Sequence, residues 1–409
     1  VYIQRDIERD IERWLESREI IAIRGPRQSG KTTLLMRIKD ILKNRGVDEN
    51  NIHYINFEDD LMRIKFEENP KEFVEFYTSS DKKQYFLLDE VQYVKDIGKR
   101  LKLIFDSFER IKIIITGSSS FDLINLGAYL VGRVIFLNLY PFSFSEFLRS
   151  KDKKYLRLYE RIRVDLRNEI EPKETVFLED LNILLQEYLT FGSYPRIVLE
   201  RSKEKKKELL KNIFITYVEK DIAGLYGARY RERVVRLLKA IAYVSGNVIK
   251  YEMLSGNSGL KYHEVRSIMP LLEDSFIIFV VKPFYRNLVN EIRKNPKLYF
   301  VDYGIRNYLL ENFENPDFDK LYENFVHNQL KRYYEVRYWR TTSKAEVDFV
   351  LKLGKEIIPI EVKRKPKVTR SFRSFIQHYR PKRALIANLD TFDRDTTDGH
   401  IFNIPFVCF

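Results

Sequence analysis

The segment with the clearest chemical pattern is a glycine-rich loop near the start of the chain. Residues 25–32 are Gly-Pro-Arg-Gln-Ser-Gly-Lys-Thr, which fits the Walker A pattern G-x-x-x-x-G-K-[ST] in full. An apolar run precedes the loop and a helical pattern follows it, and in that order backbone N–H groups and the helix N-terminus bind phosphates. We expect Lys31 to contact the β- and γ-phosphates of a nucleotide and Thr32 to bind Mg²⁺. The predicted nucleotide-binding residues are Gly25, Pro26, Arg27, Gln28, Ser29, Gly30, Lys31, Thr32 and Thr33.

An acidic pair, Asp89-Glu90, directly follows the apolar run at 85–88. A carboxylate at the end of a buried strand is the Walker B arrangement. We expect Asp89 to hold the magnesium through water and Glu90 to polarise the water that attacks ATP.

Two further catalytic roles are predicted in this region. Small hydroxyl residues end the next apolar run, and Ser118 is our first choice as sensor of the γ-phosphate, although the sequence does not separate it from Thr116. A capped turn is the alternative role of these hydroxyl residues. Arg133 is predicted as an arginine finger that reaches a neighbour's nucleotide, or else as an ordinary surface arginine.

A second group of chemical residues lies in the C-terminal quarter. Asp348, Glu361 and Lys363 form the pattern D-x12-E-x-K across a hairpin that turns at Gly354-Lys355. Alternation along a strand puts Glu361 and Lys363 on one face, and the hairpin brings Asp348 beside them. Glu323, on the preceding helix, adds a third carboxylate. Together they predict an Mg²⁺ or Mn²⁺ site, with Lys363 orienting water or offsetting charge at a scissile phosphate.

The D…E-x-K pattern also fits two structures that do not cut DNA. One is a salt-bridged hairpin, and the other is a nuclease-like fold that binds DNA without cutting it. Basic residues follow the pattern closely, and Lys365 and Lys367 are predicted DNA contacts within them, with a solvated loop as the alternative. The basic strip consists of Lys363, Arg364, Lys365, Lys367, Arg370 and Arg373.

The elements that must position the first group form a buried parallel sheet. Fully apolar runs separated by helical stretches are typical of parallel strands in an α/β fold. The predicted strands are 20–23, 52–57, 85–88, 111–116 and 134–139. The length of 409 residues predicts two or three domains at about 150 residues each. The predicted parts are a nucleotide-binding core at 1–140, a helical lid or connector at 141–230, a winged-helix module at 231–305 and a second α/β domain at 306–409.

The winged-helix prediction rests on the order of three helices and a two-stranded hairpin. A turn is expected at 256–259, before the third helix at 262–272. The exposed side of that helix would contact DNA through Lys261, Tyr262, His263 and Arg266, and the wing through Arg286, Arg293 and Lys294. A protein-docking module is the alternative. The last domain is expected to contain a helix at 321–333, strands at 336–339, 347–353 and 357–362, a helix at 372–379 and a strand at 384–387.

Composition narrows the functional classes. The 72 Lys and Arg against 59 Asp and Glu give a net charge of +13, which favours an anionic partner such as nucleic acid. The one cysteine, Cys408, excludes a disulfide framework and a thiolate zinc site. No apolar stretch is long enough to cross a membrane, and the first residues are too charged for a signal peptide, so a reducing cytoplasmic location is expected. The high charge content and few glycines and prolines are common in thermophile proteins.

Several segments together resemble the AAA-type ATPases that are widespread in archaea and bacteria and carry a C-terminal domain of unknown function. The resemblance spans nearly the whole chain and implies an ATPase with a winged-helix part and a nuclease-like C-terminal domain of the restriction-endonuclease type. The segments that carry it are Walker A, 87–92, 116–120, 132–147, 191–195, 338–341 and 346–350.

The favoured hypothesis is an ATP-hydrolysing protein that acts on DNA, with metal-dependent cutting as an added activity. The alternatives are a nucleotide-controlled switch that binds DNA or protein without cutting, and a motor that acts on a protein. A homo-oligomer is one expectation, because AAA-type sites often need a neighbouring subunit, and a partner-free monomer with an incomplete site is the alternative.

Overall fold

The computed structural model describes residues 2–78, 82–117, 126–127, 129–173, 177–218, 230–284, 295–395 and 400–409. The chain divides into two compact units, which are described separately. The first comprises Val1–Phe142 with Asp274–Phe276, and the second comprises Ser143–Glu273 with Ile277–Phe409.

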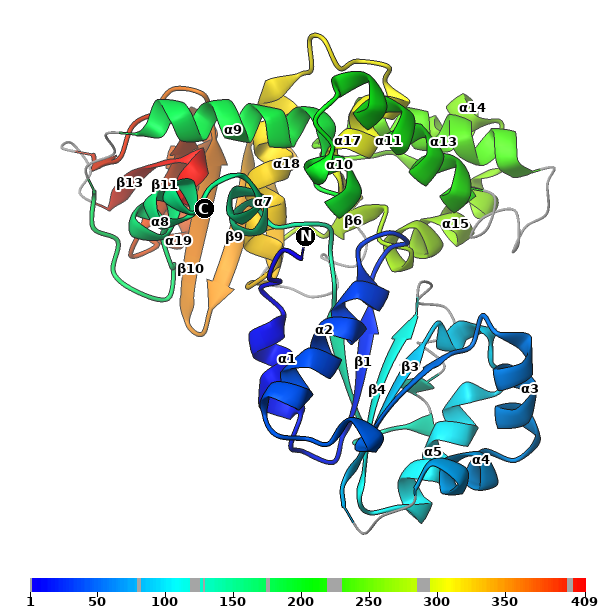
Figure 1. Cartoon of the computed structure of the whole chain (residues 1–409). Helices are drawn as coiled ribbons and strands as arrows, with labels where there is room; N and C mark the ends of the chain where they lie inside the picture. The colour runs from blue at the N-terminus through cyan, green and yellow to red at the C-terminus, as the bar shows by residue number, and fades with distance from the viewer. Residues whose placement is uncertain are drawn as a thin grey trace. The chain divides into compact units, whose positions relative to one another are not determined.

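The first unit is a parallel sheet covered by helices on both faces (Figure 1). Its strand order is β2-β3-β4-β1-β5, and the described strand pairs all run parallel. The strands are β1 (Ile20–Arg24), β2 (Ile52–Asn56), β3 (Gln84–Asp89), β4 (Ile111–Gly117) and β5 (Val134–Asn138). The helices are α1 (Glu8–Trp14), α2 (Lys31–Asn44), α3 (Asp60–Glu68), α4 (Pro70–Tyr77) and α5 (Ile97–Ser107), with short 3-10 turns η1 (Glu49–Asn51) and η2 (Val91–Tyr93). The predicted α/β core with parallel strands is confirmed.

Alternate residues of β1 pack on opposite faces of the sheet, which explains why residues 20–23 are all apolar. Ile20 and Ala22 pack with α3, α4 and α5, whereas Ile21 and Ile23 pack with α1 and α2. A strand buried on both faces has no solvent side on which polar residues would be placed. Because the strands are parallel, their carboxyl ends meet at one edge, and the loop after β1 lies there beside the ends of β3 and β4.

The second unit begins with helices. They are α7 (Phe144–Lys151), α8 (Lys153–Ile162), α9 (Leu178–Phe191), α10 (Pro195–Leu199) and α11 (Lys203–Tyr217). Three helices and an antiparallel hairpin follow: α13 (Arg231–Val244), α14 (Tyr251–Ser258), α15 (Tyr262–Asp274), β6 (Ile278–Val281) and β7 (Lys297–Phe300). This is the order that the winged-helix prediction requires, and a β-bridge also joins Val248 to Lys297.

The turn predicted at 256–259 is wrong in its extent. Helix α14 continues through Gly256 to Ser258, and only Gly259 leaves the helix, with φ +72°. The Ser258 hydroxyl donates to the Leu254 carbonyl at 2.7 Å, within the last turn of this helix. Gly259 then supplies the left-handed residue with which helices commonly end.

The last part of the chain forms a mixed sheet of order β12-β13-β11-β10-β9-β8. Two helices, α17 (Tyr303–Leu309) and α18 (Phe318–Lys331), precede it, and α19 (Arg370–Tyr379) connects β10 to β11. The strands are β8 (Val336–Arg340), β9 (Glu346–Leu353), β10 (Glu356–Val362), β11 (Ala384–Asn388), β12 (Asp393–Arg394) and β13 (Ile401–Pro405), followed by a 3-10 turn, η5 (Phe406–Cys408). The sequence did not predict β12 and β13, because β12 has two residues and β13 ends in a proline.

Adjacent residues of β9 show how the sheet is covered. The ring of Phe349 lies near His327 of α18, whereas Val350 packs in a cluster with Phe372 and Phe375 of α19. Neighbouring strand residues point to opposite faces, so α18 and α19 cover opposite faces of this sheet.

A tight turn after α9 is held by one carboxylate. Gly192 has φ +83°, and Asp302 Oδ2 accepts hydrogen bonds from the backbone N–H of Ser193 at 2.6 Å and from its hydroxyl at 2.9 Å. The other oxygen of Asp302 accepts from the Ile305 N–H at 3.0 Å and so caps α17.

We therefore expect Gly192→Ala to destabilise the protein strongly, because a Cβ there would collide with the Asp302 carboxylate. Gly259→Ala is the matched control, since it has a similar φ of +72° and no atom within 4 Å of the new Cβ. Backbone strain alone should cost Gly259→Ala about 1–2 kcal/mol, whereas Gly192→Ala should exceed about 3 kcal/mol. Urea unfolding measures both, and equal losses would contradict the collision.

Candidate functional site: a phosphate-binding loop and a carboxylate–lysine cluster

The glycine-rich loop closes on itself between β1 and α2. Lys31 is the first residue of α2, and its Nζ donates to the backbone oxygens of Gly25 and Pro26, each at 3.0 Å. Gly30 has φ +95°, where a side chain would be strained. Gly25 is needed for another reason, because a Cβ there would overlap the backbone carbonyl of Leu139.

A buried arginine that the sequence did not predict braces this loop. Arg5 is 5% exposed, and its guanidinium donates to the backbone oxygen of Ser29 at 2.8 Å and to that of Tyr140 at 2.6 Å. No local pattern distinguishes Arg5 from the many other arginines near the start of the chain. The role of Arg5 is visible only in its contacts with Ser29 and Tyr140, which are distant in the sequence.

Asp89, at the end of β3, joins the loop to the sheet. Its Oδ2 accepts from the Thr32 hydroxyl at 2.7 Å and from Tyr54 at 3.0 Å, and its Oδ1 accepts from the Thr116 hydroxyl. Burial, followed by the charge of Asp89, raises the pKa of Tyr54 above its ordinary value, so Tyr54 stays a donor. The hydroxyl of Thr32 and the carboxylate of Asp89 are the oxygen ligands that Mg²⁺ prefers, so these two residues fit the ion that accompanies a nucleotide.

Glu90 stands beside this junction in an unusual backbone conformation. Its φ is +55°, and its N–H donates to Asp89 Oδ1 at 3.1 Å. Its carboxylate accepts a hydrogen bond from Gln92, a residue for which the sequence predicts no role. The hydroxyl of Thr116 is engaged with Asp89, and Ser118 lies outside the described residues, so the choice of sensor stays a prediction.

Arg133 lies at the amino ends of the strands, whereas the phosphate-binding loop lies at their carboxyl ends. It directly precedes β5, and its backbone oxygen accepts from the N–H of Ile20 at the start of β1. Its guanidinium donates to Asp106 at 3.1 Å. Because Arg133 is at the amino ends of the strands, it does not act on the loop of its own chain, and the arginine-finger role in a neighbour stays a prediction.

The four residues predicted for a nuclease-like site do come together in the second unit. Lys363 Nζ lies 3.4 Å from Asp348 Oδ2 and 3.2 Å from Glu361 Oε1. Asp348 is on β9, Glu361 on β10 and Glu323 on α18, as the sequence predicted. The N–H of Val362 also donates to Asp348 at 2.8 Å.

A fifth residue, which the sequence did not predict, enters this cluster from β7. Lys297 Nζ lies 2.7 Å from Glu346 Oε1, 3.2 Å from Glu323 Oε1 and 3.8 Å from Asp348 Oδ1. Tyr299, two residues along the same strand, donates to Glu323 at 2.6 Å. We name these residues the carboxylate–lysine cluster: Lys297, Glu323, Glu346, Asp348, Glu361 and Lys363.

The charges in the cluster shift one another's protonation. Burial alone would lower the pKa of Lys297, but Glu323, Asp348 and Glu346 outweigh it and raise that pKa above its ordinary value. Lys297 is therefore an ammonium although it is only 1% exposed. Burial, and then the nearby Asp348, raises the pKa of Glu361 to about 7.

The metal site that the sequence predicted at these residues stays a prediction. Within the described part of the chain, no group of three or more His, Cys, Asp and Glu side chains is arranged to hold a metal ion. One oxygen of Glu323, one oxygen of Glu361 and both oxygens of Asp348 contact the ammonium groups of Lys297 or Lys363. The predicted ligands Glu323, Asp348 and Glu361 are thus neighbours in an ion-pair cluster.

The predicted DNA contacts are on exposed surfaces. Lys261, Tyr262, His263 and Arg266 are exposed at the start of α15, and the Arg266 guanidinium lies over the rings of Tyr251 and Tyr262, with 5.6 and 5.9 Å to the ring centroids. The wing residues Arg286, Arg293 and Lys294 lie outside the described residues. In the basic strip, Lys365 and Lys367 are exposed, while Arg364 pairs with Asp319.

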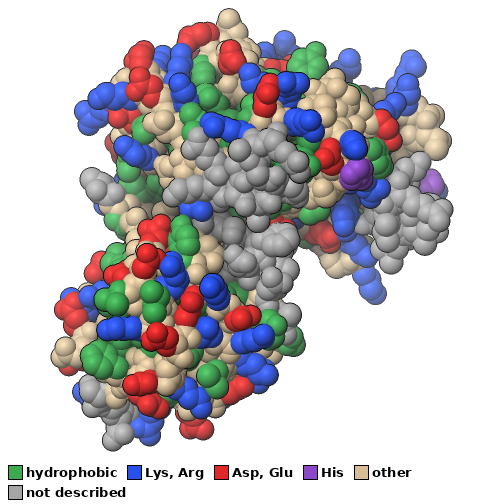
Figure 2. All heavy atoms as spheres, turned by 90° about the vertical axis from the view of Figure 1, so that its right-hand side faces the viewer, with side chains coloured by type: hydrophobic (Ala, Val, Ile, Leu, Met, Phe, Trp, Pro, Cys, Tyr) green, Lys and Arg blue, Asp and Glu red, His purple; other side chains and the backbone are tan. Residues whose placement is uncertain are grey.

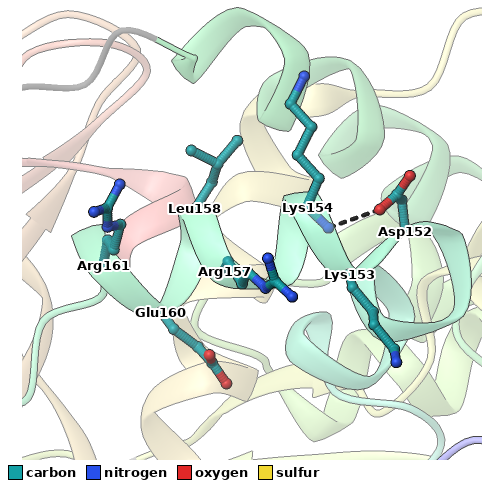
Figure 3. Close-up of a pocket in the computed structure, with 7 residues that line it drawn as sticks. All are labelled: Asp152, Lys153, Lys154, Arg157, Leu158, Glu160 and Arg161. Atoms are coloured by element: carbon teal, nitrogen blue, oxygen red, sulfur yellow. Dashed lines mark hydrogen bonds between the residues drawn. The ribbon is translucent and has the colours of Figure 1, made fainter.

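On the face of the first unit that Figure 2 shows, Lys and Arg are interspersed with Asp and Glu. An open depression of about 750 Å³ runs along α8 in the second unit (Figure 3). One helix and its cap provide the lining, and Asp152 accepts from the Lys154 N–H at 2.7 Å as that cap. None of the predicted site residues lines this depression, so we assign it no role.

Comparison with known proteins divides the chain into three matches. Residues 17–148, which contain the Walker A and Walker B motifs, match the family of AAA domains, so the first unit is similar to AAA-type P-loop domains. Residues 182–316 match a domain of unknown function (DUF8612), and residues 318–408 match another (DUF4143). Among the described residues, no helix combines the length and hydropathy needed to cross a membrane.

Several relatives align with most of the chain. A protein of Haemophilus influenzae is 29% identical over 84% of this chain and 82% of its own length. A protein of Methanocaldococcus jannaschii is 25% identical over 97% of this chain and 86% of its own length. Both are named as uncharacterised proteins.

Solved structures show weaker similarity. The replication initiator DnaA bound to AMPPCP and single-stranded DNA is 15% identical, with a TM-score of 0.33, over 66% of this chain and 90% of that one. The PCH-2 protein of C. elegans is 16% identical, with a TM-score of 0.28, over 42% of this chain. The matched region spans about half of PCH-2, at 52% of its length.

The contact between Thr32 and Asp89 leads to a test of the magnesium ligands. Thr32→Val keeps the shape of the side chain and removes the hydroxyl, so we expect affinity for Mg²⁺–ATP to fall at least about tenfold. Affinity for ATP in EDTA should stay as in the unchanged protein, because the loop and Lys31 are intact. Calorimetric titration measures both, and an equal loss with and without Mg²⁺ would contradict the assignment.

Proposed function

We propose that the protein binds ATP at the loop of residues 25–33 and hydrolyses it at Asp89 and Glu90. The hydrogen bond of 2.7 Å between Thr32 and Asp89 carries the proposal, because it brings the two halves of a P-loop site to one point. Lys31 would bind the β- and γ-phosphates, and Thr32 and Asp89 would hold Mg²⁺, which offsets the charge of the phosphates. Glu90 would accept the proton of the attacking water.

We propose further that the protein acts on DNA. Exposed basic residues on α15 and after β10 support this, as does the net charge of +13. The order of three helices followed by a hairpin supports a winged helix, whose third helix enters the major groove. Phosphates would be bound mainly by Lys365 and Lys367, with Lys261, His263 and Arg266 on the helix and Tyr262 beside them.

The C-terminal domain is proposed to bind DNA without cutting it. The order of the elements supports a restriction-endonuclease-like fold: α18 is followed by three antiparallel strands, then by α19 and a parallel strand. The convergence of Asp348, Glu361 and Lys363 favours a nuclease, but the ammonium of Lys297 lies 3.8 Å from the carboxylate of Asp348. Binding is therefore the function that the geometry supports better than cutting.

A second copy of the chain is proposed to complete the nucleotide site. Arg133 lies at the far edge of the sheet from its own loop, and AAA-type sites use an arginine to stabilise the charge on the transferred phosphate. Arg133 of one copy would then act on the nucleotide of the next.

The ATPase half is tested with Glu90→Gln. This change keeps the size of the side chain and removes the base, so kcat should fall about 100- to 10,000-fold while ATP binding is kept. Lys31→Ala is the control and should lose binding itself. Turnover of Glu90→Gln at the rate of the unchanged protein would refute the role of Glu90, and slow turnover of the unchanged protein with ADP retained would favour the nucleotide-controlled switch.

The DNA half is tested by reversing charge in the basic strip. Lys365→Glu with Lys367→Glu should lower the slope of log affinity against log salt by about two, because two phosphate contacts are lost. Lys205→Glu with Lys211→Glu, on the exposed side of α11, is the control with the same change in net charge. Equal effects of both pairs would show that overall charge, and not the strip, determines binding.

A further inference from the structure

The position of Lys297 is fixed by the backbone on both sides. It begins β7, where it pairs with Val281 of β6, and a β-bridge joins it to Val248. The segment after β6 also bonds to β8, since Tyr338 N–H donates to the Lys282 oxygen at 3.2 Å. The side chain is 1% exposed, so its ammonium is buried among the carboxylates.

Carboxylate oxygens around Lys297 already contact hydrogen-bond donors or positively charged groups of the chain. Glu323 Oε1 accepts from Tyr299 and contacts Lys297, while Glu346 places one oxygen 2.7 Å from Lys297 and the other 3.2 Å from Arg340. Each oxygen of Asp348 lies near a different ammonium, with Oδ1 near Lys297 and Oδ2 near Lys363. A divalent ion would need these oxygens at about 2.0–2.2 Å and would then stand beside a fixed positive charge.

We infer that Lys297 takes the place of the metal ion in the C-terminal carboxylate site. The ammonium supplies the positive charge that brings Glu323, Glu346 and Asp348 together, which is the role that Mg²⁺ or Mn²⁺ has in a metal site. Because Lys297 comes from the hairpin that follows the three helices, it also fixes that hairpin to the C-terminal sheet. This inference does not depend on ATP hydrolysis or on DNA binding.

Mn²⁺ binding to the full chain tests the inference, with Mn²⁺ alone as the probe and no nucleotide present. Every variant carries Thr32→Val, which removes a ligand of the other divalent-ion site. We expect the Thr32→Val protein to bind no Mn²⁺ in a saturable way up to about 1 mM, measured by electron paramagnetic resonance of the free ion. Adding Lys297→Met, which has a similar shape and no charge, should create one site per chain, at least about tenfold tighter than any binding by the parent.

Two further variants show where the new site lies. Asp348→Asn added to Lys297→Met should abolish the gained site. Lys363→Met is the matched control, because it removes a lysine from the same cluster and leaves Lys297 in place, so it should gain no site.

Three results would overturn the inference: Mn²⁺ binding by the parent that Asp348→Asn removes, a folded Lys297→Met that gains no site, or an equal gain from Lys363→Met. Circular dichroism establishes whether each variant is folded. If Lys297→Met does not fold, the Thr32→Val parent provides the test. Mn²⁺ binding by the parent that Asp348→Asn removes would overturn the inference, and no saturable Mn²⁺ binding by the parent would support it.

Discussion

A buried carboxylate needs hydrogen-bond donors or positive charges around it, and both sites depend on this constraint. Asp89 is 1% exposed at the end of β3, and it is stable there because donors from α2, β2 and β4 surround it. A buried carboxylate without partners would instead take up a proton or destabilise the fold. The hydrogen bonds of Asp89 thus join separate strands and the phosphate-binding loop into one rigid edge.

The two units meet this constraint in different ways. The described partners of Asp89 include hydroxyl groups and an N–H, which carry no net charge, and its carboxylate oxygens are of the type that binds Mg²⁺. Around Asp348 the partners include the ammonium groups of Lys297 and Lys363, which balance the charge from within the chain. The same side chain therefore suits a metal ion in one place and a salt-bridge network in the other.

Much of the fold followed from the sequence because its signals are local. The strand runs, the loop at 25–32 and the D…E-x-K spacing each depend on residues close together in the chain, and the structure places those elements within a few residues of the prediction. The end of α14 was missed because Gly256 and Asn257, residue types that favour turns, lie inside this helix. The sites were harder to predict than the fold, because Arg5, Tyr54 and Lys297 act through contacts that do not follow from any sequence spacing. Lys297 is only one of many lysines until β7 is seen beside β9 and α18.

The source of the ammonium has a consequence for how the second unit unfolds. Lys297 belongs to the hairpin of the three-helix module, whereas its partners Glu323, Glu346 and Asp348 belong to α18 and the C-terminal sheet. Separation of the hairpin from the C-terminal sheet would remove the Lys297 ammonium from these three carboxylates, while Arg340 and Lys363 would still pair with Glu346 and Asp348. Unfolding of either part therefore destabilises the other, so the boundary near residue 305 separates segments of sequence but not independent cooperative units.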